Sequence, residues 1–401
     1  MRPIRETIAV GDAKALALDA ATPVDRVERV SLSDGAGRVL AVPVVSSIDV
    51  PPFDRAAMDG YAVLARDTFG AGRDNAKLLH LVDTSYSGEA RGRRISDGEC
   101  VEIATGAPLP EGADAVVMVE ETEKTGEGVR IFIPVYPGQH VGRRATDITS
   151  GQPVGSAGSV LNAGRIGALA AVGTTTIDVY VRPRVAILST GNEIVEPGQP
   201  LGPGQIYNIN RFTLASIVAA HGGNASVGST VPDTLPDLVD AIRRAASADL
   251  IIFSGGSSVG ERDLMLDALH ETGDVIFHGI AIKPGKPTIL GKVGHAPVLG
   301  MPGNPTSCLS NAYLLVIPML RRMARLPPYE PRTVQAPLSR RIVSTTGRHQ
   351  FYTVRVIDGT AVPAFKGSGD ITSMAHADGY IEIPAQTDIV EAGEMVEVKL
   401  F

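Results

Sequence analysis

The segment that begins at Val185 alternates short apolar runs with stretches of helical periodicity, and this alternation limits the possible folds more than any other feature. The run Val185–Leu188 is continuous in apolar residues, which is typical of a strand buried on both faces of a parallel sheet. The run Leu250–Phe253 has the same character, and another strand is expected near Val298. The stretches between these runs have helical spacing. Alternating strands and helices predict a doubly wound, mostly parallel sheet.

Three loops in this segment have the composition of an anion-binding site. The run Leu250–Phe253 ends in a loop of glycine and serine that precedes a helical pattern. In an open α/β sheet, ligands bind at the carboxyl ends of the strands, where glycine lets the backbone approach and helix amides favour an anion. Such a loop also occurs where a helix merely packs on a strand, but the chain adds Ile282–Pro287, with two lysines, and Met301–Pro305. The candidate ligand-binding residues of the three loops are Ser254, Gly255, Gly256, Ser258, Gly260, Lys283, Lys286, Pro302, Gly303, Asn304 and Pro305.

Three carboxylates follow predicted parallel strands of the same segment. Glu193, Asp233 and Asp263 each come just after a strand, and parallel strands present these ends at one edge of a sheet. We expect the three side chains to face one crevice beside the glycine loop. Crowded like charges are costly without a cation, and hard oxygen ligands suit Mg²⁺. The alternative is that Asp233 and Asp263 cap the helices that follow them.

Patterns on either side of this segment predict further domains. Short β-rich runs broken by glycine extend from Tyr61 to Ile133, as in a small β domain. Helical spacing before them and after them indicates that this domain is inserted into a helical and extended linker segment. The alternation in Phe351–Val356 predicts a second β domain at the C-terminal end. The predicted α/β multidomain chain has a linker domain of residues 1–47 plus 148–181, an inserted β domain of 48–147, an α/β domain of 182–327 and a barrel-like C-terminal β domain of 328–401.

Composition argues against several classes of partner. Hydrophobic residues make up 44% of the 401 residues, so the chain can bury more than one core. A formal charge of −7 argues against nucleic acid or an anionic membrane, because both attract a basic face, and no apolar stretch has spanning length. Cys100 and Cys308 lack a metal-ligand spacing. We therefore expect a cytoplasmic setting, with Cys308 as a buried thiol rather than a nucleophile.

Six motifs in separate parts of the chain carry a family resemblance. They are Pro52-Phe53-Asp54 with Ala57–Ala62, Thr105–Pro108 with Glu111–Asp114, Ser189–Glu193, Ser254–Gly260 with Asp263, Lys283–Pro287, and Pro302–Pro305. In this order they resemble the molybdopterin molybdenumtransferase family, to which the C-terminal domain of gephyrin is related. The chain departs from the family pattern at Ala56, where a serine is usual, at Thr146, where a glutamate is common, and at Gly279, where some members have a cation.

The resemblance implies the final step of molybdenum-cofactor biosynthesis. In that reaction adenylylated molybdopterin and molybdate are the substrates, AMP is released and molybdenum is left on the dithiolene. The resemblance also implies roles for particular residues. Catalytic roles fall to Asp59, Thr105, Asp147 and Glu193; Mg²⁺ binding falls to Glu193, Asp233 and Asp263; and substrate binding extends from the three loops to Arg348 and Ser373.

The resemblance further implies a homodimer whose active site is shared between the α/β domain of one subunit and the inserted β domain of the other. The upstream adenylyltransferase and molybdoenzyme apoproteins are possible partners. Two alternatives remain open: an adenylyltransferase of the preceding step, which shares the α/β domain, and a non-catalytic scaffold like part of gephyrin. The inserted and C-terminal β domains disfavour the first. The lack of a fused adenylyltransferase domain disfavours the second.

Overall fold

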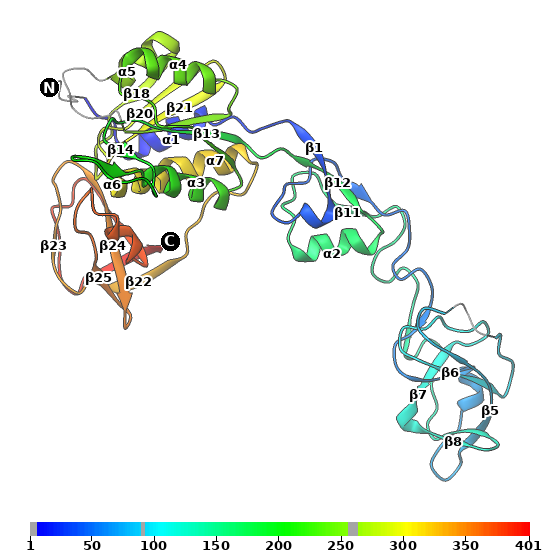
Figure 1. The fold of residues 1–401 in the computed structure, drawn as a ribbon. Helices are drawn as coiled ribbons and strands as arrows, with labels where there is room; N and C mark the ends of the chain where they lie inside the picture. The colour runs from blue at the N-terminus through cyan, green and yellow to red at the C-terminus, as the bar shows by residue number, and fades with distance from the viewer. Residues whose placement is uncertain (1–5, 90–92, 256–263) are drawn as a thin grey trace. The chain divides into compact units, whose positions relative to one another are not determined.

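The computed structural model describes residues 6–89, 93–255 and 264–401. The chain forms two compact units (Figure 1). Unit 1 comprises Met1–Glu28, Gly37–Val39 and Tyr180–Phe401, and unit 2 comprises Arg29–Ala36 and Leu40–Val179. The α/β segment and the C-terminal β domain thus belong to unit 1, and the inserted β domain belongs to unit 2.

A six-stranded sheet forms the centre of unit 1. Its strands, in spatial order, are β16 (Asn224–Val227), β13 (Arg184–Ser189), β17 (Leu250–Ser254), β21 (Ala296–Met301), β20 (Ile289–Val293) and β18 (Asp274–His278). The strands from β16 to β21 are parallel, whereas β20 and β18 each run antiparallel to their neighbours. The prediction of a mostly parallel sheet is therefore confirmed.

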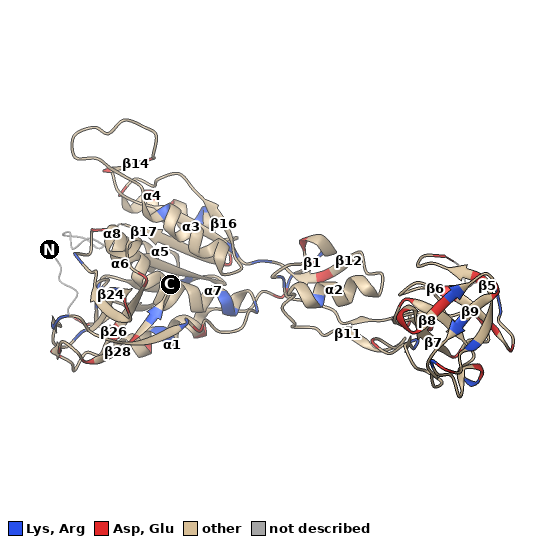
Figure 2. Cartoon of the chain, turned by 90° about the horizontal axis from the view of Figure 1, so that it is seen from below, with Lys and Arg blue, Asp and Glu red and all other residues tan. Residues whose placement is uncertain are grey.

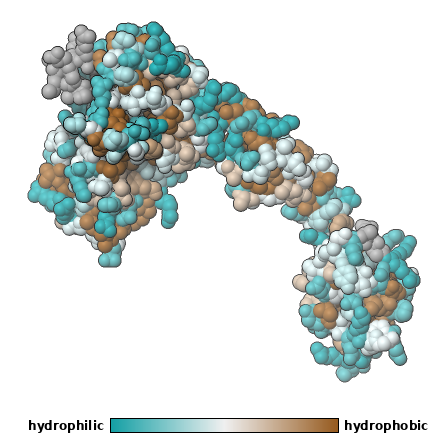
Figure 3. Space-filling view, in the orientation of Figure 1, coloured by the Kyte–Doolittle hydropathy of each residue, from teal (hydrophilic) through white to brown (hydrophobic). Residues whose placement is uncertain are grey.

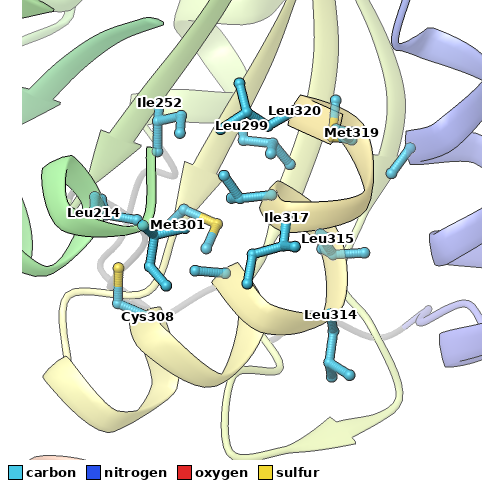
Figure 4. Packing of buried hydrophobic residues seen from close by; sticks show 14 of the residues in the cluster. Leu214, Ile252, Leu299, Met301, Cys308, Leu314, Leu315, Ile317, Met319 and Leu320 are labelled. Carbon is cyan, nitrogen blue, oxygen red and sulfur yellow. The ribbon is translucent and has the colours of Figure 1, made fainter. Parts of the chain in front are cut away.

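Helices cover both faces of this sheet, as a doubly wound fold requires. One face carries α1 (Val10–Ala20), α3 (Asn210–Ala220), α6 (Pro305–Asn311) and α7 (Ile317–Met323), and the other carries α4 (Leu235–Ala245) and α5 (Leu264–Thr272). On the first face, Leu214 of α3 packs with Ile252, Leu299 and Ile317 (Figure 4). Each such fully buried side chain contributes about 1.5–3 kcal/mol.

The order of the strands creates a switch point at the middle of the sheet. From β13 the chain passes through α3 to β16 on one side, and then through α4 to β17 on the other side of β13. In open α/β sheets, ligands bind outside the carboxyl ends of the strands where the winding direction reverses. The carboxyl ends of β13 and β17, at Ser189 and Ser254, are therefore where a ligand is expected.

Helix α1 does not pack in the linker domain that was predicted for residues 1–47. Helix α1 belongs to unit 1, where Ala13 and Ala17 are buried in the same core as α7. The apolar face of α1 is narrow, so its helical spacing alone did not indicate which domain it would cover.

The helical segment after Asn304 contains one widened turn. Between α6 and α7, residues Ala312–Val316 form a π-helical turn, η4. Pro318 follows on the first turn of α7. Because proline has no amide hydrogen and its ring clashes with the carbonyl four residues earlier, the widened turn accommodates it within one continuous helical segment.

The C-terminal β domain shares its sheet with the α/β segment. Its order is β19 (Ile282–Lys283), β24 (His349–Ile357), β26 (Gly379–Ile383), β28 (Met395–Leu400) and β22 (Thr333–Pro337), with β25 (Thr360–Pro363) paired to β24. Strands β23 (Ile342–Val343) and β27 (Ile389–Val390) form a separate pair, and α8 spans Thr372–Ala375. Strand β19 carries Lys283, the first of the two lysines in the loop Ile282–Pro287 (the lysine loop), and runs parallel to β24.

A cluster of charged side chains ties α1 to this C-terminal sheet. The Glu382 carboxylate accepts hydrogen bonds from Lys14 of α1 (3.2 Å), His349 (2.8 Å) and Lys399 (2.6 Å). Burial alone would raise the pKa of Glu382, but the bonds from His349 and Lys399 and the charges of Lys14 and Lys399 hold that pKa well below its usual range. The cluster therefore favours an ionised Glu382.

Unit 2 contains the inserted β domain. Its sheet has the order β7 (Ala115–Met118), β4 (Gly60–Val63), β6 (Glu99–Ile103), β5 (Lys77–Ser85), β9 (Gly128–Ile131) and β8 (Thr122–Thr125). Charges on β8 and β9 pair with opposite charges nearby (Figure 2), as Lys124 does with Glu102 at 2.7 Å and Arg130 with Glu123 at 2.9 Å. On the face drawn in Figure 3, apolar residues lie in small groups among hydrophilic ones.

The remaining elements are short. They are β1 (Val27–Ser31) with β12 (Thr176–Tyr180), β2 (Val44–Val45) with β11 (Pro153–Gly155), β3 (Arg55–Ala56) with β10 (Val141–Gly142), β14 (Ile194–Val195) with β15 (Ile206–Tyr207), α2 (Ala163–Ala171), and the 3₁₀ turns η1 (Leu32–Asp34), η2 (Ala65–Thr68) and η3 (Val119–Glu121). Asn162 caps α2 by accepting a hydrogen bond from the Arg165 amide. Among the described residues, no helix combines the length and the apolar character needed to span a bilayer.

Candidate active site

Two of the predicted loops meet at the switch point of the unit 1 sheet. The hydroxyl oxygens of Ser189 and Ser254, at the ends of β13 and β17, are 3.4 Å apart. The amide of Gly255 donates to the Met301 carbonyl at 3.2 Å, which brings the glycine loop beside the Pro302–Pro305 loop. A Cβ atom on Gly303 would lie 3.6 Å from the Gly255 Cα. The end of β17 and the Pro302–Pro305 loop therefore lie side by side in the fold.

Gly255 occupies a position that only glycine fits. Its φ is +105°, and an added Cβ would lie 2.3 Å from the Thr190 carbonyl oxygen. The backbone of the loop therefore passes directly against the end of β13. Gly256, Ser258, Gly260 and Asp263 lie outside the described residues, so their roles stay predictions.

Glu193 and Asp233 lie next to each other at the same edge. Thr190, after β13, forms a parallel bridge with Val231, which precedes Asp233. Both carboxylates are exposed. The protein surrounding Asp233, and then the charge of Glu193, raise the pKa of Asp233. A cation bound between two such oxygen ligands would relieve this repulsion, so the pair fits the chemistry of Mg²⁺.

Asp233 is not the cap of the helix that follows it. Thr234 is the N-cap residue of α4, and its hydroxyl accepts a hydrogen bond from the Asp237 amide at 3.3 Å. The carboxylate of Asp233 is thus available for another role. Among the described residues, no cluster of three or more histidine, cysteine or acidic side chains is arranged to hold a metal, and the third predicted ligand, Asp263, is not described.

A network that the sequence did not reveal supports the edge of β13. The buried side chain of Asn208 accepts a hydrogen bond from the Ser189 hydroxyl at 3.2 Å and donates to Glu196 at 3.2 Å. Glu196 also pairs with Arg211. The one indication of this network in the sequence was the position of Asn208, because asparagine is common just before a helix. In the structure Asn208 accepts a hydrogen bond from the Arg211 amide in α3.

The lysine loop lies against the C-terminal β domain. The Lys283 ammonium donates to the Thr345 hydroxyl at 2.8 Å. Thr345 belongs to the same loop as Arg348, whose side chain is half-buried. The structure thus brings Lys283 near the segment that contains Arg348, and Lys286 follows on the next turn of the loop.

The Pro302–Pro305 loop also contacts the C-terminal domain. The side-chain amide of Asn304 donates to the Ser368 hydroxyl at 3.0 Å, and the Thr306 hydroxyl donates to the Asp370 carbonyl at 2.9 Å. Ser373 lies just beyond this segment but is fully buried, and its hydroxyl accepts a hydrogen bond from the Lys366 amide at 2.9 Å. Ser373 therefore holds the backbone at Lys366 in place. Its predicted contact with the substrate stays a prediction.

In unit 2, Asp59 and Thr105 form a close pair. One carboxylate oxygen of Asp59 accepts hydrogen bonds from the Thr105 amide at 2.6 Å and from its hydroxyl at 2.9 Å. The amide and then the hydroxyl lower the pKa of Asp59. Both side chains are exposed, so an ionised carboxylate is presented to solvent. The next residue, Gly60, begins β4 and lies close against β7, where a Cβ would lie 1.9 Å from the Val117 carbonyl oxygen.

Asp147 lies in the loop that follows β10. The Ala56 amide donates to the Ala107 carbonyl, beside Thr105, and the Ala57 amide donates to the His140 carbonyl at 2.8 Å. These bonds join the loop that contains Asp59 to the segments that contain Thr105 and His140, whereas the Asp147 amide donates to the Val50 carbonyl at 3.0 Å. Asp147 itself is exposed.

Neither cysteine is placed for nucleophilic chemistry. Cys100 and Cys308 are free and fully buried. Burial raises the pKa of each thiol to about 12, so the reactive thiolate is disfavoured. The prediction of a buried structural thiol at Cys308 is confirmed.

Comparisons with known proteins agree along the whole chain. The MoeA N-terminal region (domains I and II) matches residues 8–173, a molybdopterin binding domain matches 186–322, and the MoeA C-terminal region (domain IV) matches 335–401. Molybdopterin molybdenumtransferase 2 of Mycobacterium tuberculosis is 36% identical, covering 92% of this chain and 94% of its own. The molybdopterin molybdenumtransferase of Haemophilus influenzae is 33% identical, covering 94% of both chains. The crystal structure of a molybdopterin biosynthesis MoeA protein from Pyrococcus horikosii has 39% sequence identity and a TM-score of 0.85, covering 98% of this chain and 99% of that one.

Proposed function

Because the chain belongs to the MoeA family of molybdopterin molybdenumtransferases, we propose that it inserts molybdenum into adenylylated molybdopterin with release of AMP. This is the final step of molybdenum-cofactor biosynthesis. The observation that supports it best is the meeting of the Gly255 and Gly303 loops with the Glu193 and Asp233 carboxylates at the switch point of one sheet.

In this proposal the loops of unit 1 bind the anionic parts of the substrates. Glycine at residue 255 and residue 303 lets the backbone approach a phosphate, and Lys283 and Lys286 supply positive charge, since molybdate and the pyrophosphate linkage are both anionic. Arg348 would contribute from the C-terminal domain.

The carboxylates would hold Mg²⁺ beside the pyrophosphate. Glu193 and Asp233 supply hard oxygen ligands that already repel each other, and Asp263 would complete the set. When bound, the cation offsets negative charge on the phosphates during cleavage of the nucleotide linkage. The role of Glu193 and Asp233 in this proposal is to hold the pyrophosphate linkage, through the cation, against the loop at Gly255.

We further propose that the protein acts as a homodimer. Asp59, Thr105 and Asp147 would then complete the site from the inserted β domain of the second subunit. The exposed, ionised Asp59 supports this role, because such a group suits an electrostatic or proton-accepting task at a shared site. The upstream adenylyltransferase and molybdoenzyme apoproteins are the proposed transient partners. The two buried free thiols suit a reducing, cytoplasmic setting.

The test is AMP release from adenylylated molybdopterin in the presence of Mg²⁺ and molybdate. Wild-type protein is expected to release AMP, and Asp233→Ala is expected to reduce the rate at least tenfold. Asp240→Ala, which removes an exposed carboxylate of α4, is the matched control. Folded wild-type protein that releases no AMP, or an Asp233→Ala variant with full activity, would contradict the proposal.

The adenylyltransferase alternative predicts the preceding reaction, in which pyrophosphate rather than AMP is released. Such an enzyme would consume ATP and form the adenylylated compound without molybdate. The same assay, run with ATP and unmodified molybdopterin, separates the two activities. A scaffold would show neither.

A further inference from the structure

A buried amide on α6 holds the turn between the two lysines. Asn311, the last residue of α6, is 1% exposed. Its side-chain nitrogen donates to the Gly285 carbonyl at 2.9 Å and to the Thr288 hydroxyl oxygen at 2.6 Å. The Thr288 hydroxyl in turn donates to the same Gly285 carbonyl at 2.9 Å. Two donors, the Asn311 amide and the Thr288 hydroxyl, therefore converge on the Gly285 carbonyl of the lysine loop.

The fit between Asn311 and Gly285 is close. Gly285 has a φ of +104°, and an added Cβ would lie 2.5 Å from the Asn311 side-chain nitrogen and 2.6 Å from its oxygen. The amide plane thus packs directly on the glycine backbone. Since the Gly285 carbonyl can only accept a hydrogen bond, the Asn311 nitrogen must face it.

The next peptide is fixed from the other side. The Lys286 carbonyl accepts hydrogen bonds from the Ile280 amide at 3.0 Å and the Thr288 amide at 2.9 Å. Lys283 is held separately, by the pairing of β19 with β24 and by Thr345. The backbone that carries both lysines is therefore fixed at several consecutive peptides.

Packing alone does not account for an asparagine here. Asn311 lies on α6 beside the buried apolar residues Cys308, Ala312 and Leu315. Its side-chain oxygen is buried and has no hydrogen-bond partner among the described residues. An unpaired buried acceptor is costly, and a leucine of similar shape would avoid this cost. What the asparagine supplies, and a leucine would not, is the donor to the lysine loop.

We propose that Asn311 is a positioning residue that preorganises the Lys283–Lys286 turn for an anionic ligand. The inference rests on the proposed function, because that function supplies an oxyanion for the lysines to bind. A turn fixed before binding loses less conformational entropy when the ligand arrives. Asn311 touches no substrate in this proposal and acts through the backbone of Gly285.

The first measurement is amide hydrogen exchange of residues 278–289 in Asn311→Leu. The Ile280 and Thr288 amides are expected to exchange at least tenfold faster than in wild type, while the melting temperature is unchanged or higher. Ser310→Ala is the control, because among the described residues that buried hydroxyl bonds only within its own helix, to the Ser307 carbonyl. Unchanged exchange in Asn311→Leu would overturn the proposal.

The second measurement is the affinity of the folded protein for molybdate and for inorganic pyrophosphate by calorimetry. Asn311→Leu is expected to bind both about tenfold more weakly, and Ser310→Ala is expected to match wild type. Equal affinity in Asn311→Leu, or no binding of either anion to wild type, would overturn the proposal. Wild-type protein that binds the anions but releases no AMP would instead contradict the proposed function, without contradicting the role of Asn311.

Thr288→Val tests the same peptide without changing α6. It is expected to reproduce the weaker anion binding, and the double variant Asn311→Leu with Thr288→Val is expected to be little worse than either single variant, because both act on the Gly285 carbonyl. Fully additive losses in affinity would show that the two side chains act independently and would contradict the inference.

Discussion

The pKa of Asp233 is raised, first by burial and then by the negative charge of Glu193, which lies beside it at the carboxyl edge of the sheet. We expect Glu193→Gln to lower the pKa of Asp233, because it removes this repulsion. Carboxyl NMR titration of the metal-free protein measures the shift, with Asp240→Asn as a control that should leave Asp233 unchanged. An Asp233 pKa that does not move in Glu193→Gln would show that the two groups are not coupled.

The same coupling predicts how activity depends on pH. A raised pKa means that Asp233 becomes protonated at a higher pH than an ordinary aspartate as the solution is acidified. Because metal binding requires the ionised form, the concentration of Mg²⁺ needed for half-maximal AMP release should rise as the pH falls. The measurement is a Mg²⁺ titration at several pH values. A requirement that is independent of pH down to the ordinary range of aspartate would contradict the assignment of Asp233 as a ligand.

Glu382 should contribute to stability in a manner that depends on pH. Glu382→Gln removes a charge that accepts bonds from Lys14, His349 and Lys399, and we expect a loss of about 1.5–3 kcal/mol at pH 7. Since the pKa of Glu382 is lowered in the folded protein, its stabilising effect is fully present above the unfolded value of about 4.3 and is lost as the pH falls through the folded value.

Urea unfolding at pH 7 and at pH 3 measures this effect. The difference between wild type and Glu382→Gln should shrink at the lower pH. Glu391→Gln, which removes one partner of the exposed pair with Arg341, is the control and should cost less than about 1 kcal/mol. A difference for Glu382→Gln that is equal at both pH values would argue against an ionised Glu382.

Thr105→Ala should raise the pKa of Asp59 partway toward its ordinary value. The change removes the hydroxyl donor and keeps the amide donor, which is the larger cause of the lowered pKa. Thr122→Ala, whose hydroxyl bonds the Val119 carbonyl, is the control. Carboxyl NMR measures the shift, and AMP release should fall in Thr105→Ala alone. If the Asp59 pKa is unchanged by Thr105→Ala, the bond to the hydroxyl does not form in solution.

A shared active site predicts complementation between two inactive variants. Asp59→Asn and Asp233→Asn should each be inactive, whereas mixed dimers would contain one intact site made of one intact domain from each subunit. Random mixing makes half of the dimers mixed, so about a quarter of wild-type AMP release should return. A mixture that stays inactive, with mixed dimers verified by mass spectrometry, would place all the catalytic residues of one site in a single subunit.

Local patterns in the sequence were sufficient for the central sheet and the loops. The apolar runs at Val185–Leu188 and Leu250–Phe253 did become β13 and β17, because a strand buried on both faces needs an uninterrupted apolar run. The loops after them meet, because parallel strands share one edge.

Features that depend on contacts between distant residues could not be predicted in this way. The burial of α1 beside α7 and the pairing of β19 with β24 join segments far apart in the chain. The bonds from Asn208 to Glu196 and from Asn311 to Gly285 are each made by one polar side chain whose partner has no fixed spacing from it in the sequence. A periodicity argument treats such residues as interruptions, so it carries no information about their partners.

The pairing of β19 with β24 has a consequence for any attempt to isolate the α/β segment. Two residues of the lysine loop, Ile282 and Lys283, complete their backbone hydrogen bonds in the sheet of the C-terminal domain. A truncation after Pro328 would therefore leave that strand as an open edge and release one end of the loop. Such a fragment should retain its central sheet yet bind oxyanions more weakly than the full chain, because Lys283 would have lost its backbone partners in β24.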